Sequence, residues 1–213
     1  MLARSLLVVT LVGCHASSAN AIDANGDGAP SIDGDPDPGI GCADGAREGF
    51  TDMAMYPAIA ACSGAWIIPG IDADRSDDPG CKTSGNDSPT SAVACSAANL
   101  CAPAWHVCAG ATEVAAHLPS GQTCTSALTA AGFFATNQGS VGSGLCGATG
   151  ANDLFGCGGL GNAASTSCAP LDRSSGNNCA AITSEGWSCG SAASEERTHV
   201  IKPRVPGGVL CCK

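Results

Sequence analysis

The sequence of 213 residues is poor in aromatic side chains and in charge. Aromatic residues make up 4% of the chain and charged residues 13%, and only 9 Lys and Arg stand against 19 Asp and Glu. The resulting net charge of -10 argues against nucleic acid and anionic lipid headgroups as partners. Because few large side chains are available for a core, a stable fold of this chain needs covalent crosslinks.

Long apolar runs are also missing, and one short run lies near the N-terminus. Arg4 precedes the apolar residues 5–13, a pattern typical of a signal peptide and far shorter than the ~20 residues that span a bilayer. The run ends in Leu-Val-Gly-Cys at 11–14, which resembles the lipobox of bacterial lipoproteins. The resemblance implies that residues 1–13 are a signal peptide and that the Cys14 thiol carries a diacylglycerol.

The lipoprotein resemblance also carries an expectation about localisation. In the export rule of that family, an Asp after the lipidated cysteine retains the protein in the inner membrane, whereas this chain has His15. The expected protein is exported and lipid-anchored at the cell envelope, on the outer membrane or the cell surface. The alternative is an ordinary secretory signal, cleaved near Ala16 or Ala19.

Cysteine is plentiful, with 15 residues, but the spacing Cys-x-x-Cys does not occur. This absence disfavours a zinc ribbon and a thioredoxin-like redox site. Without Cys14 an even number remains, which can pair completely in an oxidising compartment. The cysteines expected in disulfide bonds are Cys42, Cys62, Cys81, Cys95, Cys101, Cys108, Cys124, Cys146, Cys157, Cys168, Cys179, Cys189, Cys211 and Cys212. Their connectivity cannot be derived from the sequence.

Composition divides the rest of the chain into further parts. Residues 14–41 contain several Asp but no Lys, Arg or aromatic residue, so they bury too little apolar surface to offset the entropy of ordering. We expect an acidic, disordered tether there. A polar stretch at 76–89 then separates a small cysteine-rich segment, 42–89, from the main disulfide-rich domain, 90–213.

Within the tether, Asp23, Asn25 and Asp27 match the first ligand positions of a calcium-binding loop. Gly34 occupies the position that needs a bidentate Glu, and Pro30 the position usually held by an aliphatic residue. The stretch is also similar to one incomplete copy of the aspartate-rich repeats of thrombospondin-like proteins. A weak calcium site and a plain linker are therefore the alternatives, and no other cofactor is predicted.

The main body is predicted to be an α+β fold with two short helices, short antiparallel strands and long loops. Helices are expected at 90–102 and 112–118, the second with Thr112 as N-cap and Pro119 after its last turn. Strands are expected at 133–136, 152–155, 179–183, 199–202 and 207–212. This order places the helices before the strands.

Cys211 and Cys212 are neighbours, and their Cα atoms are ~3.8 Å apart, which is below the usual span of a disulfide bond. Each of them therefore needs a different partner. If both lie in a strand, their side chains point to opposite faces, one into the body and one outward to a neighbouring segment.

Over residues 90–212, the order of elements resembles the C-type lectin-like domain, including its Link variant. In that family a helix cysteine is bonded to the last strand, which implies that Cys101 pairs with Cys211 or Cys212. The family's second disulfide bond corresponds to the cysteines at 179 and 189.

The motifs that bind calcium and sugar in that family are absent. Ser188 and Cys189 follow Trp187 in place of the family's Trp-Asn-Asp, and neither Glu-Pro-Asn nor Gln-Pro-Asp occurs. A sugar site in this chain would therefore need other residues.

Trp105 and His106 are candidates for a stacking surface that binds a sugar or an aromatic ligand, and Trp187 is a third candidate. The alternative for Trp105 is packing on a disulfide bond in the core. His117 is expected to be exposed on its helix.

Two acidic stretches are further candidate sites. Asp72 and Asp74, with the acids at 77–78, suggest either a cation site in a loop closed by Cys62 and Cys81 or a solvated acidic loop. Residues 195–199 bring two Glu near a His, but the zinc motif H-E-x-x-H is absent, so a charged surface loop is expected.

No catalytic constellation emerges, because G-x-S-x-G is absent and no free thiol is expected. The sequence therefore predicts a surface-anchored, non-enzymatic binding module for an extracellular polysaccharide or a surface protein. The lipid anchor attaches the module to its membrane partner. Disulfide bonds keep its loops rigid, which lowers the ordering cost of binding. A structural envelope or matrix lipoprotein and a secreted hydrolase with an unrecognised carboxylate site are the alternatives.

Overall fold

The computed structural model describes residues 39–76, 94–137, 154–163, 168–174, 177–190, 196–204 and 206–213, and all of them belong to one unit, Pro36–Lys213. The expected signal peptide, Cys14 as the expected lipid site, and residues 15–38 of the expected tether, with the calcium candidates Asp23, Asn25 and Asp27, lie outside the described residues. The same holds for Cys81, Cys146, the acids at 77–78 and Glu195.

The last residues of the expected tether, 39–41, are described and are bonded to the body: the Arg47 guanidinium donates to the carbonyls at 39 and 40, and the main-chain N–H of Ala102 donates to the carbonyl at 41 at 2.9 Å. The expectation that the disordered tether reaches residue 41 is therefore wrong.

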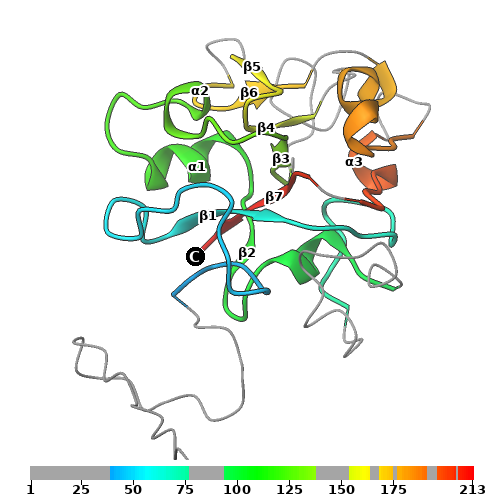
Figure 1. The fold of residues 1–213 in the computed structure, drawn as a ribbon, viewed down its shortest axis with the longest axis horizontal. Helices are drawn as coiled ribbons and strands as arrows, with labels where there is room; N and C mark the ends of the chain where they lie inside the picture. The colour runs from blue at the N-terminus through cyan, green and yellow to red at the C-terminus, as the bar shows by residue number, and fades with distance from the viewer. Residues whose placement is uncertain are drawn as a thin grey trace, which may run out of the picture. The chain divides into compact units, whose positions relative to one another are not determined.

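A mixed β-sheet crosses this unit in the strand order β1-β7-β3-β4-β6-β5 (Figure 1). The strands are β1 Ile59–Ser63, β2 His106–Val107, β3 Phe134–Ala135, β4 Phe155–Cys157, β5 Asn162–Ala163, β6 Asp172–Arg173 and β7 Gly208–Cys212. Strand β7 is antiparallel to β1 along one edge, while its other edge pairs in parallel with β3 and antiparallel with β2. The expectation of an entirely antiparallel sheet is wrong at the β3–β7 pair.

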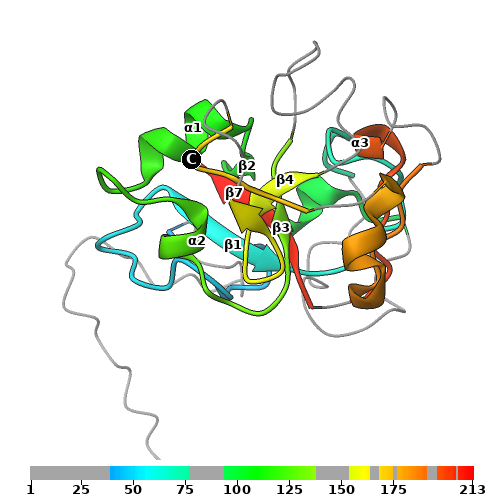
Figure 2. The ribbon, with the colours of Figure 1, turned by 90° about the horizontal axis from the view of Figure 1, so that it is seen from above.

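Short helices cover both faces of the sheet. These are the α-helices α1 Ala111–His117, α2 Cys124–Ala127 and α3 Glu196–His199, and the 3-10 helices η2 Ala97–Leu100 and η3 Asn177–Glu185. Seen from above, α1 and α2 lie on one side of the sheet and α3 lies on the other (Figure 2). The described part is thus a small, disulfide-rich fold that combines helices with a mixed sheet.

Two cores lie on the two faces of the sheet. The first core contains Ala60, Cys62, Val209 and Cys211 from β1 and β7, with Trp66, Trp105, Phe133, Cys179, Ile182 and Trp187. The second core contains Ile59, Ala61, Leu210 and Cys212 from the same strands, with Phe50, Tyr56, Val114, Cys124, Phe134 and Leu171. Neighbouring residues of a strand fall in different cores because side chains alternate between the faces with a period of two.

Cys211 and Cys212 follow this alternation. They belong to different cores, as expected for neighbours in a strand, and each is 0% exposed. As expected, each has its own partner: Cys211 is bonded to Cys101 and Cys212 to Cys108. Both bonds are buried, because helices and loops cover both faces of the sheet.

Every cysteine in the described part is disulfide-bonded. The bonds with both partners described are Cys42–Cys62, Cys101–Cys211, Cys108–Cys212, Cys124–Cys157 and Cys179–Cys189. The pair Cys42–Cys62 excludes the predicted loop closure between Cys62 and Cys81. These crosslinks compensate for a core that has few large side chains.

Residues 42–76 share their sheet and cores with the rest of the chain. Strand β1 pairs with β7 along its whole length, from Ile59 opposite Cys212 to Ser63 opposite Gly208. The described part of the cysteine-rich segment 42–89 therefore builds one sheet with the main domain.

Several elements differ from the sequence prediction. Strand β1 was not predicted, and within the expected helix 90–102 the described residues are helical only in η2. Helix α1 matches the expected 112–118 closely, but its N-cap is Gly110 and not Thr112. Because β1 and β2 precede α1, the predicted order of helices before strands is also wrong.

Residues 179–183 form part of η3 and not a strand. Cys179 and Ile182 are buried there, whereas Ala180, Ala181 and Thr183 are exposed. This spacing of three matches the 3-10 helix, in which residues i and i+3 lie on one face. The expected strand 199–202 is reduced to isolated bridges at its last two residues, after α3.

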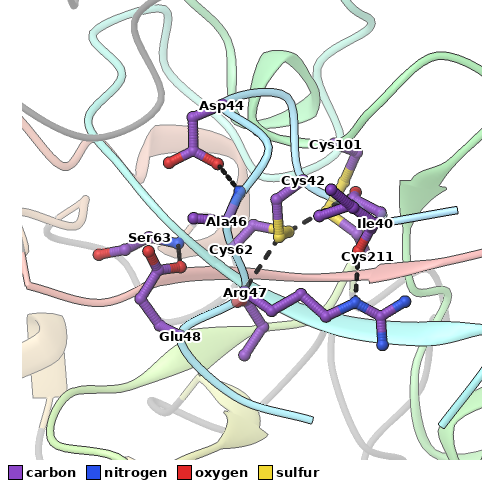
Figure 3. The surroundings of a disulfide bond; sticks show 12 residues. Ile40, Cys42, Asp44, Ala46, Arg47, Glu48, Cys62, Ser63, Cys101 and Cys211 are labelled. Atoms are coloured by element: carbon purple, nitrogen blue, oxygen red, sulfur yellow. Dashed lines mark hydrogen bonds between the residues drawn. A yellow bond between two sulfur atoms is a disulfide. The ribbon is translucent and has the colours of Figure 1, made fainter. Parts of the chain in front are cut away.

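Arg47 ties the start of the described chain to the body. Its guanidinium donates to the carbonyls of Ile40 and Gly39 on one side (Figure 3 shows the Ile40 bond). On the other side, Nη1 donates to the carbonyls of Phe50 at 2.9 Å, Tyr56 at 2.8 Å and Ile59 at 3.1 Å. Partial burial lowers the pKa of Arg47 through desolvation.

Candidate functional site

A pocket with a volume of about 290 Å³ lies beside β2. Its lining residues are Ile71, Asp72, Ala73, Asp74, Arg75, Ala98, Trp105, His106, Val107, Ala109 and Asn137. The large apolar members are buried: Ile71 is 1% exposed, Trp105 6% and Val107 7%. The charged members of the lining are exposed or partly exposed, so an apolar floor is surrounded by a charged rim.

Crosslinks on both sides fix the wall that β2 provides. Cys101, which precedes β2, is bonded to Cys211, and Cys108, which follows it, is bonded to Cys212. The ladder to β7 holds the strand between these two bonds. The main-chain N–H of Asn137, after β3, donates to the carbonyl of Cys108 at 2.8 Å and fixes the adjoining part of the lining.

The opposite wall is the loop 71–75, which the protein holds by polar contacts. The main-chain N–H of Ile71 donates to the carbonyl of Arg197 at 2.8 Å, and the Asp72 carboxylate pairs with the Arg197 guanidinium at 3.3 Å. Arg75 donates from Nη1 to the carbonyl of Cys101 at 2.5 Å. The loop is therefore attached both to α3 and to the crosslinked segment before β2.

His106 is held in position at the rim by Glu113. The imidazole Nε2 lies 2.8 Å from Oε1 of Glu113, and Oε2 of the same carboxylate accepts the main-chain N–H of Ala109 at 2.5 Å. Because a carboxylate only accepts hydrogen bonds, Nε2 is the donor of the pair. The second ring nitrogen, Nδ1, then remains for other contacts.

The structure brings together residues that the sequence treated as two separate candidates. Asp72 and Asp74 from one stretch line the same pocket as Trp105 and His106 from another. The burial of Trp105 and its place beside the disulfide cysteines of the first core agree with the packing alternative. Its ring also lies 5.5 Å from the Arg47 guanidinium, so Trp105 forms part of the pocket floor and not an open stacking platform.

Trp187 lies in the first core and does not line the pocket. It is 2% exposed and packs edge-to-face on Trp66 at 5.6 Å and on Phe133 at 5.9 Å. The Lys202 ammonium lies 5.5 Å from its ring centroid. A side chain so enclosed has no face for an external ligand.

Arg75 and Asn137 were missed as site residues. Both reach the pocket through the fold: Arg75 by its bond to the crosslinked Cys101, and Asn137 by following β3 alongside β2. No local pattern in the sequence marks either residue.

Of the predicted surface loop 195–199, Arg197 and Thr198 are partly buried, His199 is exposed, and the three lie in α3.

A possible metal cluster can be dismissed on chemical grounds. Ligand atoms of Cys108, Glu113 and Cys212 approach one another closely. The two sulfur atoms are bonded to each other, however, so neither is a thiolate that can bind a metal. The remaining single carboxylate is engaged with His106 and Ala109.

Two buried ionisable groups lie away from the pocket. Desolvation raises the pKa of Asp172, which accepts from the Thr125 hydroxyl and the Gly158 main chain. Desolvation likewise lowers the pKa of Lys202 to about 8, and its ammonium donates to the carbonyls of Glu185 at 3.2 Å and of Arg204.

No protein-family model matches the chain, and no solved structure matches it either. Within the part of the chain that the structure describes, no helix has the length and apolar character needed to cross a membrane.

Proposed function

We propose that the protein is a non-enzymatic binding module of the cell envelope, and that the pocket beside β2 holds a unit of an extracellular polysaccharide. The observation that carries the proposal is the combination of a buried apolar floor with a charged rim on a crosslinked wall. Ligand sites of this kind are concave, apolar inside and equipped with a few fixed polar groups.

Sugar chemistry matches this lining. The C–H face of a pyranose packs on apolar side chains such as Ile71 and Val107, while its hydroxyls exchange hydrogen bonds with Asp74, Arg75 and His106. The volume of about 290 Å³ lies just below the ~300–1,000 Å³ typical of ligand pockets. A pocket of this size suits a short stretch of a polysaccharide better than the flat contact area of a protein partner.

We propose a C-type lectin-like arrangement as the finer description of the fold. The bonds Cys101–Cys211 and Cys179–Cys189 are pairs that the resemblance implies, and β7 is the last strand of the chain. The pocket uses none of the family's missing sugar motifs. A saccharide site at β2 would therefore be this chain's own.

Anchoring belongs to the same proposal. With a diacylglycerol on Cys14 and residues 15–38 as a tether, the module projects from the envelope surface to which it is exported. This placement brings the pocket within reach of envelope polysaccharides.

A glycan array tests the function with the full chain in detergent and two matched histidine variants. His106→Ala removes a rim contact, whereas His117→Ala changes a histidine that does not line the pocket. We expect micromolar binding to at least one class of saccharide, weakened about fivefold or more by His106→Ala and unchanged by His117→Ala. Silence of the array, or equal effects of the two variants, would overturn the proposal.

A further inference from the structure

Most of the charged side chains around the pocket already have partners within the protein. Asp72 pairs with Arg197 at 3.3 Å, and His106 pairs with Glu113 at 2.8 Å. Arg75 donates to the carbonyl of Cys101. These contacts position the walls, and the pairing with Arg197 also offsets the charge of Asp72. The bond from Arg75 to a neutral carbonyl leaves its remaining donors available for hydroxyls.

Asp74 differs from these neighbours. Its carboxylate is exposed, it lines the pocket, and among the described residues it makes no hydrogen bond or ion pair. It is therefore a full negative charge that is available to whatever occupies the pocket. The net charge of -10 over the whole chain adds a field of the same sign.

The chemistry of the ligand follows from this charge. A neutral ligand that covers Asp74 displaces water from the carboxylate, which costs free energy unless the ligand returns strong hydrogen bonds. An anionic ligand would add repulsion between like charges. A cation returns the lost solvation as a charge-assisted hydrogen bond to the carboxylate.

We infer that the pocket selects a saccharide unit that carries a protonated primary amine, with Asp74 as its counter-ion. This inference rests on the proposed function, because it specifies the class of saccharide. The amine lies against Asp74 on the loop wall, the ring packs on the apolar floor, and hydroxyls reach His106 on the β2 wall.

Calorimetric titration of the full chain in detergent tests this selection with three β-1,4-linked oligosaccharides of equal length. They are oligomers of glucosamine, of N-acetylglucosamine and of glucose, measured at mildly acidic pH, where the free amine is protonated. We expect the glucosamine oligomer to bind about fivefold or more tightly than the other two, since exposed ion pairs contribute modestly. This preference should shrink between about 50 mM and about 500 mM NaCl, because salt screens the charge pair.

Two isosteric variants localise the effect. In Asp74→Asn, the ratio of the affinity for the glucosamine oligomer to the affinity for the glucose oligomer should fall to about one, since the counter-ion of the amine is removed. Asp52→Asn is the matched control, because Asp52 is an exposed acid that does not line the pocket. It makes the same change in net charge, so a general field effect would appear in both variants.

The possible failures are distinguishable. Equal affinities for aminated and neutral oligomers, or an amine preference that survives Asp74→Asn, would overturn the inference and leave the proposed function standing. Tighter binding of acidic than of aminated saccharides on the array would also overturn it. If no saccharide binds in the titrations or on the array, the proposed function falls and the inference falls with it.

Discussion

Cys211 and its neighbour Cys212 are bonded on opposite faces of the sheet to Cys101 and Cys108, which flank β2. The residues just before and just after the short strand β2 are thus both attached covalently to the central strand β7. The arrangement fixes one wall of the pocket more firmly than the two-residue ladder between β2 and β7 could do alone.

The two crosslinks should contribute to stability in a strongly non-additive way. When one of the two bonds is already formed, the other closes a loop of roughly 8 residues, which contributes about 2.5 kcal/mol to stability. The first bond to form closes a loop of over a hundred residues, which contributes about 5 kcal/mol. We expect Cys108→Ala/Cys212→Ala and Cys101→Ala/Cys211→Ala each to lower the free energy of unfolding by about 2–3 kcal/mol, and the quadruple variant by about 7 kcal/mol. Guanidinium unfolding of the three variants measures this, and simple additivity of the two losses would contradict it.

Arg47 is expected to be a major stabilising residue of the N-terminal part. Its Nη1 donates to the main-chain carbonyls of the buried residues Phe50, Tyr56 and Ile59. Each of these acceptors, if left without a donor, costs about 1–3 kcal/mol. Arg47→Met should therefore lower the free energy of unfolding by about 3 kcal/mol or more. Arg204→Met is the control, because the guanidinium of Arg204 is exposed and donates to the carbonyl of Ser184. Comparable losses in the two variants would show that the arrangement around Arg47 is unimportant.

Asp172 should make stability depend on pH in the acidic range. Its pKa is raised in the folded state, mainly by desolvation, so the folded protein binds a proton more tightly than the unfolded chain. At a pH above the pKa of Asp172 in the folded state, the buried charge lowers the free energy of unfolding. This destabilisation is relieved as the pH falls through that pKa towards the ordinary value of 3.8. Asp172→Asn, which keeps an acceptor for Thr125, should raise neutral stability by about 1 kcal/mol.

The measurement for Asp172 is urea unfolding of wild type and variant from neutral pH downward. The stabilisation by Asp172→Asn should disappear at acid pH, where the wild-type carboxyl is protonated. The exposed acid Asp52 serves as control, since Asp52→Asn keeps its turn acceptor and should show little stabilisation. A gain that persists unchanged at acid pH would rule out desolvation of the charge as its cause.

The sequence predicts some elements and not others for identifiable reasons. The run Gly-Val-Leu-Cys-Cys of β7 is rich in β-formers, and α1 is bounded by Pro119, so both were located nearly correctly. Strand β1 consists of Ile-Ala-Ala-Cys-Ser, buried on both faces, and such small residues show no polar alternation. η3 lies largely inside the loop closed by Cys179–Cys189, where tertiary context and not propensity sets the conformation.

The pocket illustrates the same limit. The sequence identified His106 and Asp72 as polar residues of interest but gave no reason to place them together. Their meeting depends on the connectivity of the disulfide bonds and on the contact between Asp72 and Arg197, which joins the loop to α3. Connectivity among so many cysteines is not encoded in any local pattern, so the site could only be assembled from the structure.

The lipid anchor remains a prediction that one substitution tests. If Cys14 carries the diacylglycerol, Cys14→Ser should abolish incorporation of labelled fatty acid and release the protein from the membrane fraction. The variant still exports if the apolar run acts as an ordinary signal, so its secretion serves as the internal control. Continued labelling or membrane retention of Cys14→Ser would contradict lipidation at this residue.

Lys202 should make stability rise with pH in the alkaline range. It is 0% exposed and its pKa is lowered to about 8 from 10.5, mainly by desolvation. The unfolded chain therefore binds more protons between these two values, and the free energy of unfolding must increase through that window, by about 3 kcal/mol in total. Glu185 opposes the shift electrostatically and Arg204 adds to it. In Lys202→Met this slope should vanish.

The slope, and not the absolute stability, is the informative quantity for Lys202. Replacement by Met removes a desolvated charge but also leaves the carbonyls of Glu185 and Arg204 without their donor, so the two effects oppose each other at neutral pH. Guanidinium unfolding from about pH 7 to about pH 10.5 separates them, because only the charge responds to pH. Lys213→Met provides the control, since Lys213 is exposed. Equal slopes for wild type and Lys202→Met would mean that the ammonium of Lys202 titrates normally and that water or a carboxylate reaches it.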